Sequence, residues 1–250
     1  MKVRDPLSRI RVVLSRPSHP GNIGAAARAL KTMGLARLSL VRPKAFPHAE
    51  ARAMATGARD VLESARVCTT LDEALAGTTL SIAMSSRKRE LSHPPLDARA
   101  AARELVRAAR RGEVALVFGN ETVGLSNEEV MRCSHIARIP VDPGYASLNL
   151  AQAVQVMAYE VRMAAQAPQK AAPGKRAAPG IESATHEEIE NFYVHLERSL
   201  YASGFLHPRY PRKLMDRLRR LFAKARLEKV EVNILRGMLT LWEESGSGKK

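Results

Sequence analysis

The sequence has few cysteines and no long apolar run. Cys68 and Cys133 are its only two cysteines, and neither belongs to a metal-ligand spacing or a pairing pattern. Both are expected to be small core residues of a reduced, intracellular protein. The N-terminal stretch MKVRDPLSRI lacks the apolar segment of a signal peptide, and no run reaches the roughly 18 apolar residues of a membrane helix. The sequence therefore predicts a cytoplasmic protein with no membrane partner.

Aromatic residues and acids are also scarce. Aromatics make up 4% of the chain, which argues against a broad platform for stacking nucleobases. The 40 Lys and Arg residues outnumber the 25 Asp and Glu residues, giving a net charge of +15. Such a charge attracts polyanions through counterion release, so RNA, DNA or an anionic membrane surface are the candidate partners. A generally Arg-rich composition is the alternative explanation.

Motifs of several common enzyme classes are missing. The seven histidines show no H-x-x-x-H or Cys/His metal spacing, and the chain has no G-x-S-x-G elbow and no P-loop. Metal hydrolases, serine hydrolases and nucleotide kinases are therefore disfavoured, and no metal site is expected.

The chain divides into three regions. Residues 1–165 alternate short apolar runs with helical patterns, which predicts an α/β domain with a parallel sheet and helices on its faces. Residues 166–184 (QAPQKAAPGKRAAPGIESA) have no apolar period and predict a flexible linker. Residues 185–245 predict a small all-helical domain. The expected strands are 11–14, 38–41, 80–84, 114–118 and 136–141, and the expected helices are 23–33, 97–110, 127–133, 148–165, 185–203, 211–225 and 230–243.

Capping patterns mark several of these helices. Ser126 with Glu129, and Thr185 with Glu188, each form a capping box, and Ser147 is placed to cap the helix that follows it.

One helix of the C-terminal region is strongly basic. Residues 209–226 hold eight basic residues and one acid, Asp216. Leu214, Leu218, Leu221 and Phe222 are expected to form its apolar stripe. A solvated helix face is the alternative, but the density of charge favours a phosphate-binding surface. The basic residues that share one flank are Lys213, Arg217, Arg220 and Lys224.

Three stretches place small or polar residues between a strand and a helix, where parallel sheets bind ligands. In the first, PGNIGAAAR, Asn22 is expected to cap a helix on which Gly24 and Arg28 share a face. Small side chains beside an Arg would let a bulky ligand reach that helix. Ordinary helix capping is the alternative, and the stretch is not the G-x-G-x-x-G dinucleotide fingerprint.

The second stretch, VFGNETVGL, ends a buried strand at Gly119, which allows close backbone approach or an unusual φ. Asn120 and Glu121 then offer an amide and a carboxylate, with a plain turn as the alternative. The third runs from Ile139 through YASLNL, where Ser147 and Asn149 begin an apolar helix.

Taken together and in this order, the three stretches resemble the motifs of the SpoU branch of the SPOUT methyltransferases, N-x-G-x-x-x-R, F-G-N-E-x-x-G-L and I-P…S-L-N-L-A-x-A. The resemblance covers residues 10–165, and the phrases LRRLF and NILRG extend it into the C-terminal region. It implies a parallel α/β fold with a C-terminal trefoil knot, an exception to ordinary topology rules. It also implies a homodimer formed through the knot region.

The resemblance implies a reaction and a site. The reaction is methyl transfer from S-adenosylmethionine to the 2′-hydroxyl of a cytidine or uridine in tRNA, at nucleotide 32 of the anticodon loop. Arg28 matches the family's catalytic Arg. A guanidinium stays protonated, so Arg28 is expected to hold a phosphate and steady the developing alkoxide rather than act as a base. The residues expected to orient Arg28 and the ribose are Asn22, Glu121, Ser147 and Asn149.

The cofactor is expected to lie among the loops of the knot, with backbone groups holding the adenine and Ile139 and Leu148 as apolar walls. Met84 stands where relatives carry Thr, so a hydroxyl of those relatives is missing here. The expected cofactor-binding residues are Met84, Ser85, Ser86, Gly119, Ile139, Ala146, Ser147 and Leu148.

Other functions remain open at this point. A SpoU-type enzyme could act on ribosomal RNA or on another tRNA position, and a non-catalytic RNA-binding protein could share the fold. A DNA-binding protein is disfavoured because the chain has no groove-reading motif.

Overall fold

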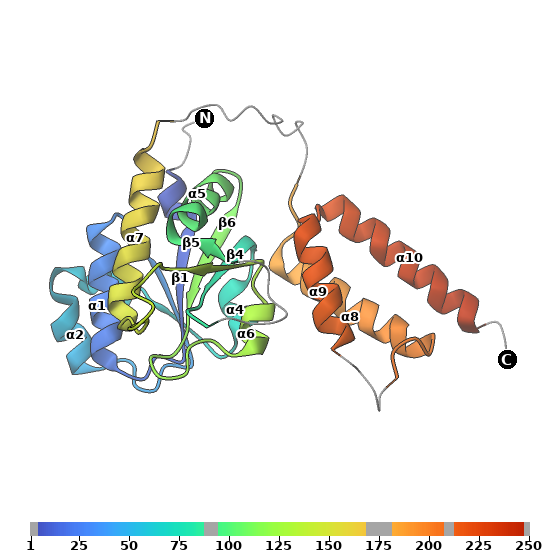
Figure 1. Ribbon diagram of the computed structural model, residues 1–250, viewed down its shortest axis with the longest axis horizontal. Helices are drawn as coiled ribbons and strands as arrows, with labels where there is room; N and C mark the ends of the chain where they lie inside the picture. The colour runs from blue at the N-terminus through green and yellow to red at the C-terminus, as the bar shows by residue number, and fades with distance from the viewer. Residues whose placement is uncertain (1–4, 88–94, 169–181, 208–212, 248–250) are drawn as a thin grey trace. The chain divides into compact units, whose positions relative to one another are not determined.

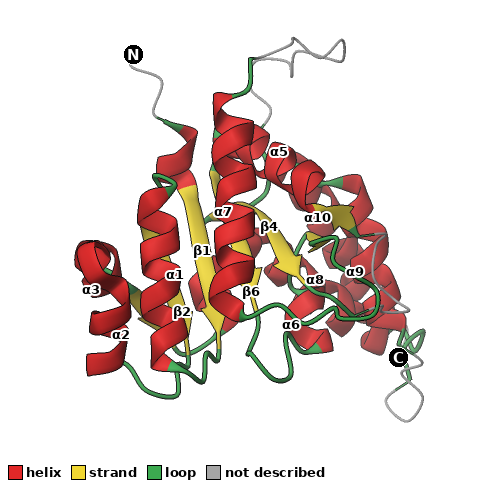
Figure 2. Ribbon diagram, turned by 60° about the vertical axis from the view of Figure 1, so that its left-hand side comes forward, coloured by secondary structure: helices red, strands yellow, loops and turns green. Residues whose placement is uncertain are grey.

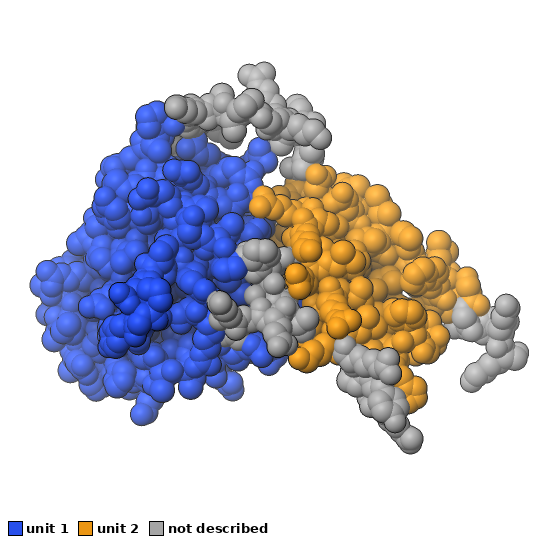
Figure 3. Space-filling view, viewed as in Figure 1, with its two compact units in different colours: residues 1–170 blue, residues 171–250 orange. Residues whose placement is uncertain are grey.

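The computed structural model describes residues 5–87, 95–168, 182–207 and 213–247. The chain forms two compact units, residues 1–170 and residues 171–250 (Figure 3). Each unit has its own core and is treated separately below. None of the described helices combines the length and apolar character needed to cross a membrane.

Unit 1 is built on a parallel sheet, which confirms the predicted fold class. In its described part, seven strands lie in the order β3-β2-β1-β6-β4-β7-β5, and every neighbouring pair is parallel. All six residues of β1 are buried, as expected for a strand covered on both faces. The strands are β1 (Ile10–Ser15), β2 (Arg37–Val41), β3 (Arg66–Cys68), β4 (Thr78–Met84), β5 (Leu96–Asp97), β6 (Glu113–Phe118) and β7 (His135–Arg138).

Helices cover both faces of this sheet. On one face Ile23, Leu105 and Met157 belong to a large core formed by α1 (Pro20–Thr32), α5 (Ala98–Ala109) and α7 (Leu150–Gln166) (Figure 2). On the other face α4 (Leu71–Leu75) and α6 (Asn127–Met131) pack on a smaller core. Three further short elements, α2 (Ala49–Ala55), a 3-10 turn at Thr56–Ala58 and α3 (Arg59–Glu63), follow β2, and a 3-10 turn at Pro6–Arg9 precedes β1.

All five predicted strands are present, but shorter elements and two helix starts differ from the prediction. The strands β3 and β5 and the helices α2, α3 and α4 were not predicted. The first helix begins at Pro20, with His19 at its N-cap, so Asn22 lies in the first turn instead of capping it. The last helix of unit 1 is capped by Asn149, whose Oδ1 accepts from the Ala151 and Gln152 backbone N–H groups, and not by Ser147.

Unit 2 contains three described helices, α8 (His186–Ala202), α9 (Leu214–Ala225) and α10 (Lys229–Ser247) (Figure 1). The predicted capping box of Thr185 and Glu188 opens α8, as that of Ser126 and Glu129 opens α6. Phe192 and Phe222 meet edge to face, with ring centroids 5.0 Å apart. Leu221 is 58% exposed, so its predicted place on the apolar stripe is wrong. The expected helix start at Pro211 and most of the predicted linker lie outside the described residues.

Candidate active site

A cavity of about 400 Å³ opens beside the carboxyl ends of β4, β6 and β7, where a parallel sheet is expected to hold its ligand. Its volume lies within the usual range of sites for small organic molecules. Apolar walls alternate with hydroxyl groups and backbone around it. All eight residues predicted to bind a cofactor line this cavity: Met84, Ser85, Ser86, Gly119, Ile139, Ala146, Ser147 and Leu148.

The cavity also has lining residues that the sequence reasoning missed. Phe118, at the end of β6, and Leu150 and Ala153, in the first turn of α7, add apolar surface. Arg87 adds an exposed guanidinium from the loop after β4. Its place three residues after a predicted strand is the signal that could have identified it.

Gly119 is required by close packing in the loop that follows β6. A Cβ at this position would overlap the backbone of Gly124 and Leu125, so the loop folds back on itself only with glycine here. Asn120 fastens the same loop, because its Oδ1 accepts from the Thr122 and Val123 N–H groups and its Nδ2 donates to the Arg16 carbonyl at 2.8 Å. The loop therefore presents Glu121 in a fixed position.

Glu121 accepts four hydrogen bonds from the loop after β1 and the first turn of α1. Its carboxylate accepts from the backbone N–H and hydroxyl of Ser18 at 2.8 and 2.7 Å, from the His19 N–H at 3.2 Å and from Asn22 Nδ2 at 3.0 Å. Partial burial raises the pKa of Glu121, but the hydrogen bonds from Asn22 and Ser18 outweigh it and lower the pKa to about 2. Glu121 is thus ionised at neutral pH and acts as an acceptor only.

A directed chain of amides runs from this carboxylate to α7. Because Glu121 only accepts, Asn22 must turn its Nδ2 toward it and its Oδ1 away. That Oδ1 accepts from Asn149 Nδ2 at 3.0 Å, and Asn149 Oδ1 then accepts from the first N–H groups of α7. Three of the five predicted catalytic residues are therefore linked, and a fourth, Ser147, lies beside them in the cavity wall.

Arg28, the fifth, lies apart from this network. It is exposed on α1, does not line the cavity, and makes no hydrogen bond or ion pair with any described residue. Arg28 lies six positions after Asn22, which is about 9 Å along a helix. Its guanidinium is therefore free to meet a group from outside the unit.

The predicted reason for the small residues near Arg28 is wrong. Gly24 and Ala27 are buried, so no ligand reaches the helix surface there. A Cβ on Gly24 would overlap the backbone carbonyl of Ala51, which shows that α2 occupies the space. Gly24 serves the contact between α1 and α2.

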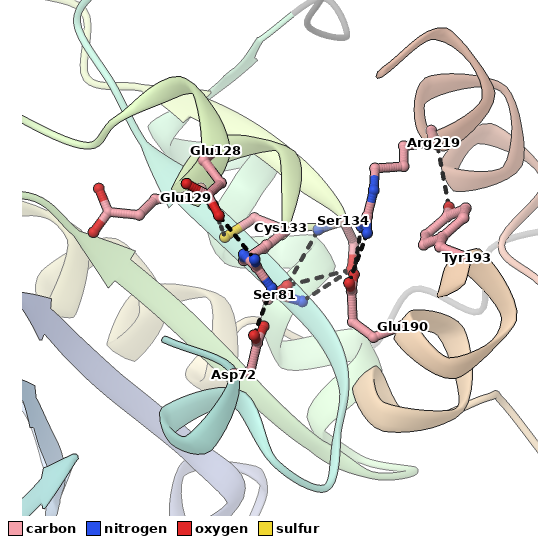
Figure 4. A network of polar contacts seen from close by, with 10 residues as sticks. Asp72, Ser81, Glu128, Glu129, Cys133, Ser134, Glu190, Tyr193 and Arg219 are labelled. Atoms are coloured by element: carbon pink, nitrogen blue, oxygen red, sulfur yellow. Dashed lines mark hydrogen bonds and ion pairs between the residues drawn. The ribbon is translucent and has the colours of Figure 1, made fainter. Parts of the chain in front are cut away.

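The segment between α6 and β7 is joined to β4 by a partly buried polar cluster (Figure 4). Ser81 and Ser134 exchange hydrogen bonds between backbone N–H and hydroxyl at 3.2 and 3.1 Å. The neighbouring Cys133 is buried, and desolvation raises the pKa of its thiol to about 12. Cys133 is thus an inert core residue, as predicted, and Cys68 is buried as well.

The basic residues of α9 differ in their surroundings. Arg219 is paired with Glu190 at 2.6 Å and lies 4.3 Å over the Tyr193 ring, so it belongs to the fold of unit 2. The four predicted RNA-binding residues have no carboxylate partner among the described residues: Lys213, Arg217 and Lys224, which are exposed, and Arg220, which is half-buried. In the same described part of the chain, no group of three or more His, Cys, Asp or Glu side chains is placed to hold a metal ion.

Comparison with known proteins shows similarity over nearly the whole chain. Residues 9–159 match the SpoU rRNA Methylase family, and residues 187–250 match the C-terminal domain of the tRNA methyltransferase TrmJ. The tRNA (cytidine/uridine/adenosine-2′-O-)-methyltransferase TrmJ of Pseudomonas aeruginosa strain UCBPP-PA14 is 51% identical over 249 residues, covering 97% of this chain and 96% of that protein.

Two solved structures extend the comparison. The crystal structure of TrmJ from Z. mobilis ZM4 is 34% identical, with a TM-score of 0.80, over 93% of this chain and 98% of that one. An AdoMet-bound rRNA methyltransferase from Sinorhizobium meliloti is 26% identical, with a TM-score of 0.51, over 62% of this chain and 56% of that one.

Proposed function

This chain belongs to the SpoU methylase family, and from that membership we propose that it is a tRNA (cytidine/uridine-2′-O-)-methyltransferase. The observation that carries the proposal is the Glu121–Asn22–Asn149 chain, which borders a cavity lined by all eight expected cofactor residues. The match of unit 2 to the TrmJ C-terminal domain selects tRNA over ribosomal RNA.

The cavity suits S-adenosylmethionine, which supplies an electrophilic methyl group on a sulfonium. Ile139 and Leu148 give apolar walls for a purine, and the loop after β4 brings the hydroxyls of Ser85 and Ser86. Met84 packs partly against the main core, so its side chain contributes apolar contact at the position of the family's Thr. The solved relative with bound AdoMet supports this assignment.

The residues around the cavity would position the ribose. Methyl transfer needs the 2′-oxygen about 3 Å from the methyl carbon and in line with the bond that breaks. Glu121, with a pKa of about 2, is a weak base and stays charged, so its role is to hold Asn22 and the loop at Ser18. Asn149 lies at the exposed end of the same network, and Ser147 is exposed in the cavity wall, so both are open to a nucleotide.

Arg28 would bind the substrate through its phosphate. Guanidinium groups are poor bases in proteins, so we assign Arg28 to phosphate binding instead of general-base catalysis. Its exposure and lack of a carboxylate partner among the described residues leave its fork available to a phosphate. Neither Arg28 nor the ionised Glu121 is therefore proposed to accept the proton of the 2′-hydroxyl group.

The active form would be a homodimer. On α7, Val156, Tyr159 and Met163 recur at i, i+3 and i+7 and are 37%, 49% and 38% exposed. An exposed apolar stripe on a helix that borders the site is expected to be buried against another protein surface. A second copy, meeting this face in the region expected to be knotted, would supply it.

The two units would have separate functions, catalysis and tRNA binding. Residues 1–165 would form the methyltransferase domain and residues 185–245 a tRNA-binding domain that uses the α9 cations without a described carboxylate partner. The predicted linker, residues 166–184, is too long at both ends, because Gln166 still belongs to α7 and Ser183 and Ala184 already pair and pack within unit 2. This arrangement fits a substrate nucleotide at position 32, with a folded tRNA reaching both units. Adenosine belongs to the specificity of the P. aeruginosa relative and is a further candidate base.

Two measurements test the proposal. Calorimetric titration with S-adenosylmethionine should show binding, and labelled methyl groups should then pass to tRNA. Cofactor binding without transfer would identify a non-catalytic protein on this fold, and transfer to ribosomal RNA alone would identify a sister enzyme.

A further inference from the structure

A loop in unit 1 that has no assigned role carries two cations beside the proposed site, and neither has a carboxylate partner among the described residues. Strands β1 and β2 are neighbours, with Ser15 paired to Val41, and each is followed by an Arg-Pro pair, Arg16-Pro17 and Arg42-Pro43 (Figure 2). Both arginines have positive φ values, 53° and 47°. Both therefore leave the sheet in the same way, at the edge that holds the cavity.

The two loops are fastened to each other. The Arg16 N–H donates to the Val41 carbonyl at 2.7 Å, and the Lys44 N–H donates to the Pro17 carbonyl at 3.0 Å. The loop after β2 therefore lies against the loop whose Ser18 holds Glu121. Strand β2 lies two strand spacings, or about 10 Å, from β6, whose end lines the cavity.

The side chains of Arg16 and Arg42 differ in their contacts. Arg16 binds Glu129 at 2.8 Å, so its charge is used within the fold. Arg42 and Lys44 are exposed and have no carboxylate partner in the described ranges. A non-glycine residue at positive φ carries a conformational cost, and among the described residues no hydrogen bond or ion pair of the Arg42 side chain offsets it.

The composition of the loop after β2 also favours anion binding. Residues 42–48 contain no acid, and Pro43 and Pro47 restrict the backbone, which reduces the entropy lost on binding. We propose that Arg42 and Lys44 bind backbone phosphates of the tRNA strand next to the methylated nucleotide, as a contact of the catalytic unit distinct from α9. This inference rests on the proposed tRNA methyltransferase function.

The test compares the full-length chain with the double variant Arg42→Gln and Lys44→Gln, and with Arg111→Gln as a matched control. Arg111 is exposed, has no carboxylate partner in the described part of unit 1, and precedes β6 at the opposite edge of the sheet. In the double variant the log–log salt dependence of tRNA affinity should become shallower by about 1.4, for two contacts to a single strand. The control should keep the wild-type slope.

Steady-state kinetics separate this inference from the proposed function. The KM for tRNA should rise roughly tenfold in the double variant, while kcat at saturating tRNA and the affinity for S-adenosylmethionine stay within twofold of wild type. A wild-type slope and KM in a double variant that methylates tRNA would overturn the inference alone. A wild-type protein that fails to methylate tRNA would instead overturn the proposed function.

Discussion

Asn149 Nδ2 donates to Asn22 Oδ1 at 3.0 Å, joining two residues that lie 127 positions apart in the sequence. Asn22 stands in the first turn of α1 and Asn149 at the N-cap of α7. The bond therefore ties the starts of two helices together at the cavity and passes the orientation set by Glu121 from one to the other.

The variant Asn149→Asp separates the two roles of this residue. An Asp is an equally good N-cap, so α7 should stay folded, and the melting temperature should fall only by the few degrees that the lost Asn22 bond accounts for. The new carboxylate oxygen, however, faces Asn22 Oδ1 and cannot donate to it. Methylation should fall about 10- to 100-fold, since a broken hydrogen bond of this kind costs about 1–3 kcal/mol. Thermal unfolding and initial rates measure the two effects, and a fully active variant would show that the bond is dispensable.

Glu121 makes the stability of unit 1 depend on pH. Its pKa is lowered from 4.5 to about 2, so its stabilising contribution is complete above the unfolded pKa and is lost as the pH falls toward 2. Denaturant unfolding of wild type and Glu121→Gln should differ by a constant amount above pH 5 and converge between pH 4.5 and about 2. A difference that stays constant over that lower range would contradict the lowered pKa.

Gly24 should tolerate no side chain. The Cβ of Gly24→Ala would overlap the Ala51 carbonyl, so α1 or α2 must move, at a cost of about 2–3 kcal/mol of unfolding free energy. Gly57→Ala is the matched control, because a Cβ there meets nothing within 4 Å. Denaturant titration should show a loss for the first variant and a change of under about 1 kcal/mol for the second. Equal effects would argue that α2 does not limit position 24.

Neutralising the α9 cations should weaken tRNA binding in a salt-dependent way. With Lys213, Arg217 and Arg220 changed to Gln, the log–log slope of affinity against salt should decrease by about 2 to 3, for three lost phosphate contacts. Arg236→Gln is the control, since that Arg is exposed on α10 and unpaired among the described residues. A slope unchanged by the triple variant would remove α9 from the tRNA interface.

Much of unit 1 could be predicted because its long strands are apolar on both faces and its three motif stretches all follow strands. The parallel order of the strands brings the loops after β4, β6 and β7 to one edge, which is why the eight cofactor residues meet. The short elements β3 and α4, of three and five residues, were missed because their sequences show no clear period.

The wrong predictions for single residues have their causes in contacts with residues far away in the sequence. The start of α1 at Pro20 was missed because its N-cap residue, His19, makes no side-chain cap hydrogen bond, and the turn before it is held by Glu121, 103 residues beyond Ser18. The role of Gly24 depends on α2, which the sequence pattern did not reveal. Leu221 followed the apolar spacing of α9, yet the small core of unit 2 leaves it exposed.

The central claim is methyl transfer to a tRNA ribose, and it is tested most directly by mass spectrometry of tRNA incubated with the protein and S-adenosylmethionine. Nuclease fragments of the anticodon loop should carry one new methyl group, and complete digestion should release it as 2′-O-methylcytidine or 2′-O-methyluridine. Tracing it to nucleotide 32 would settle the position as well. Unmodified tRNA, or a methyl group carried on a base instead of the ribose, would contradict the claim.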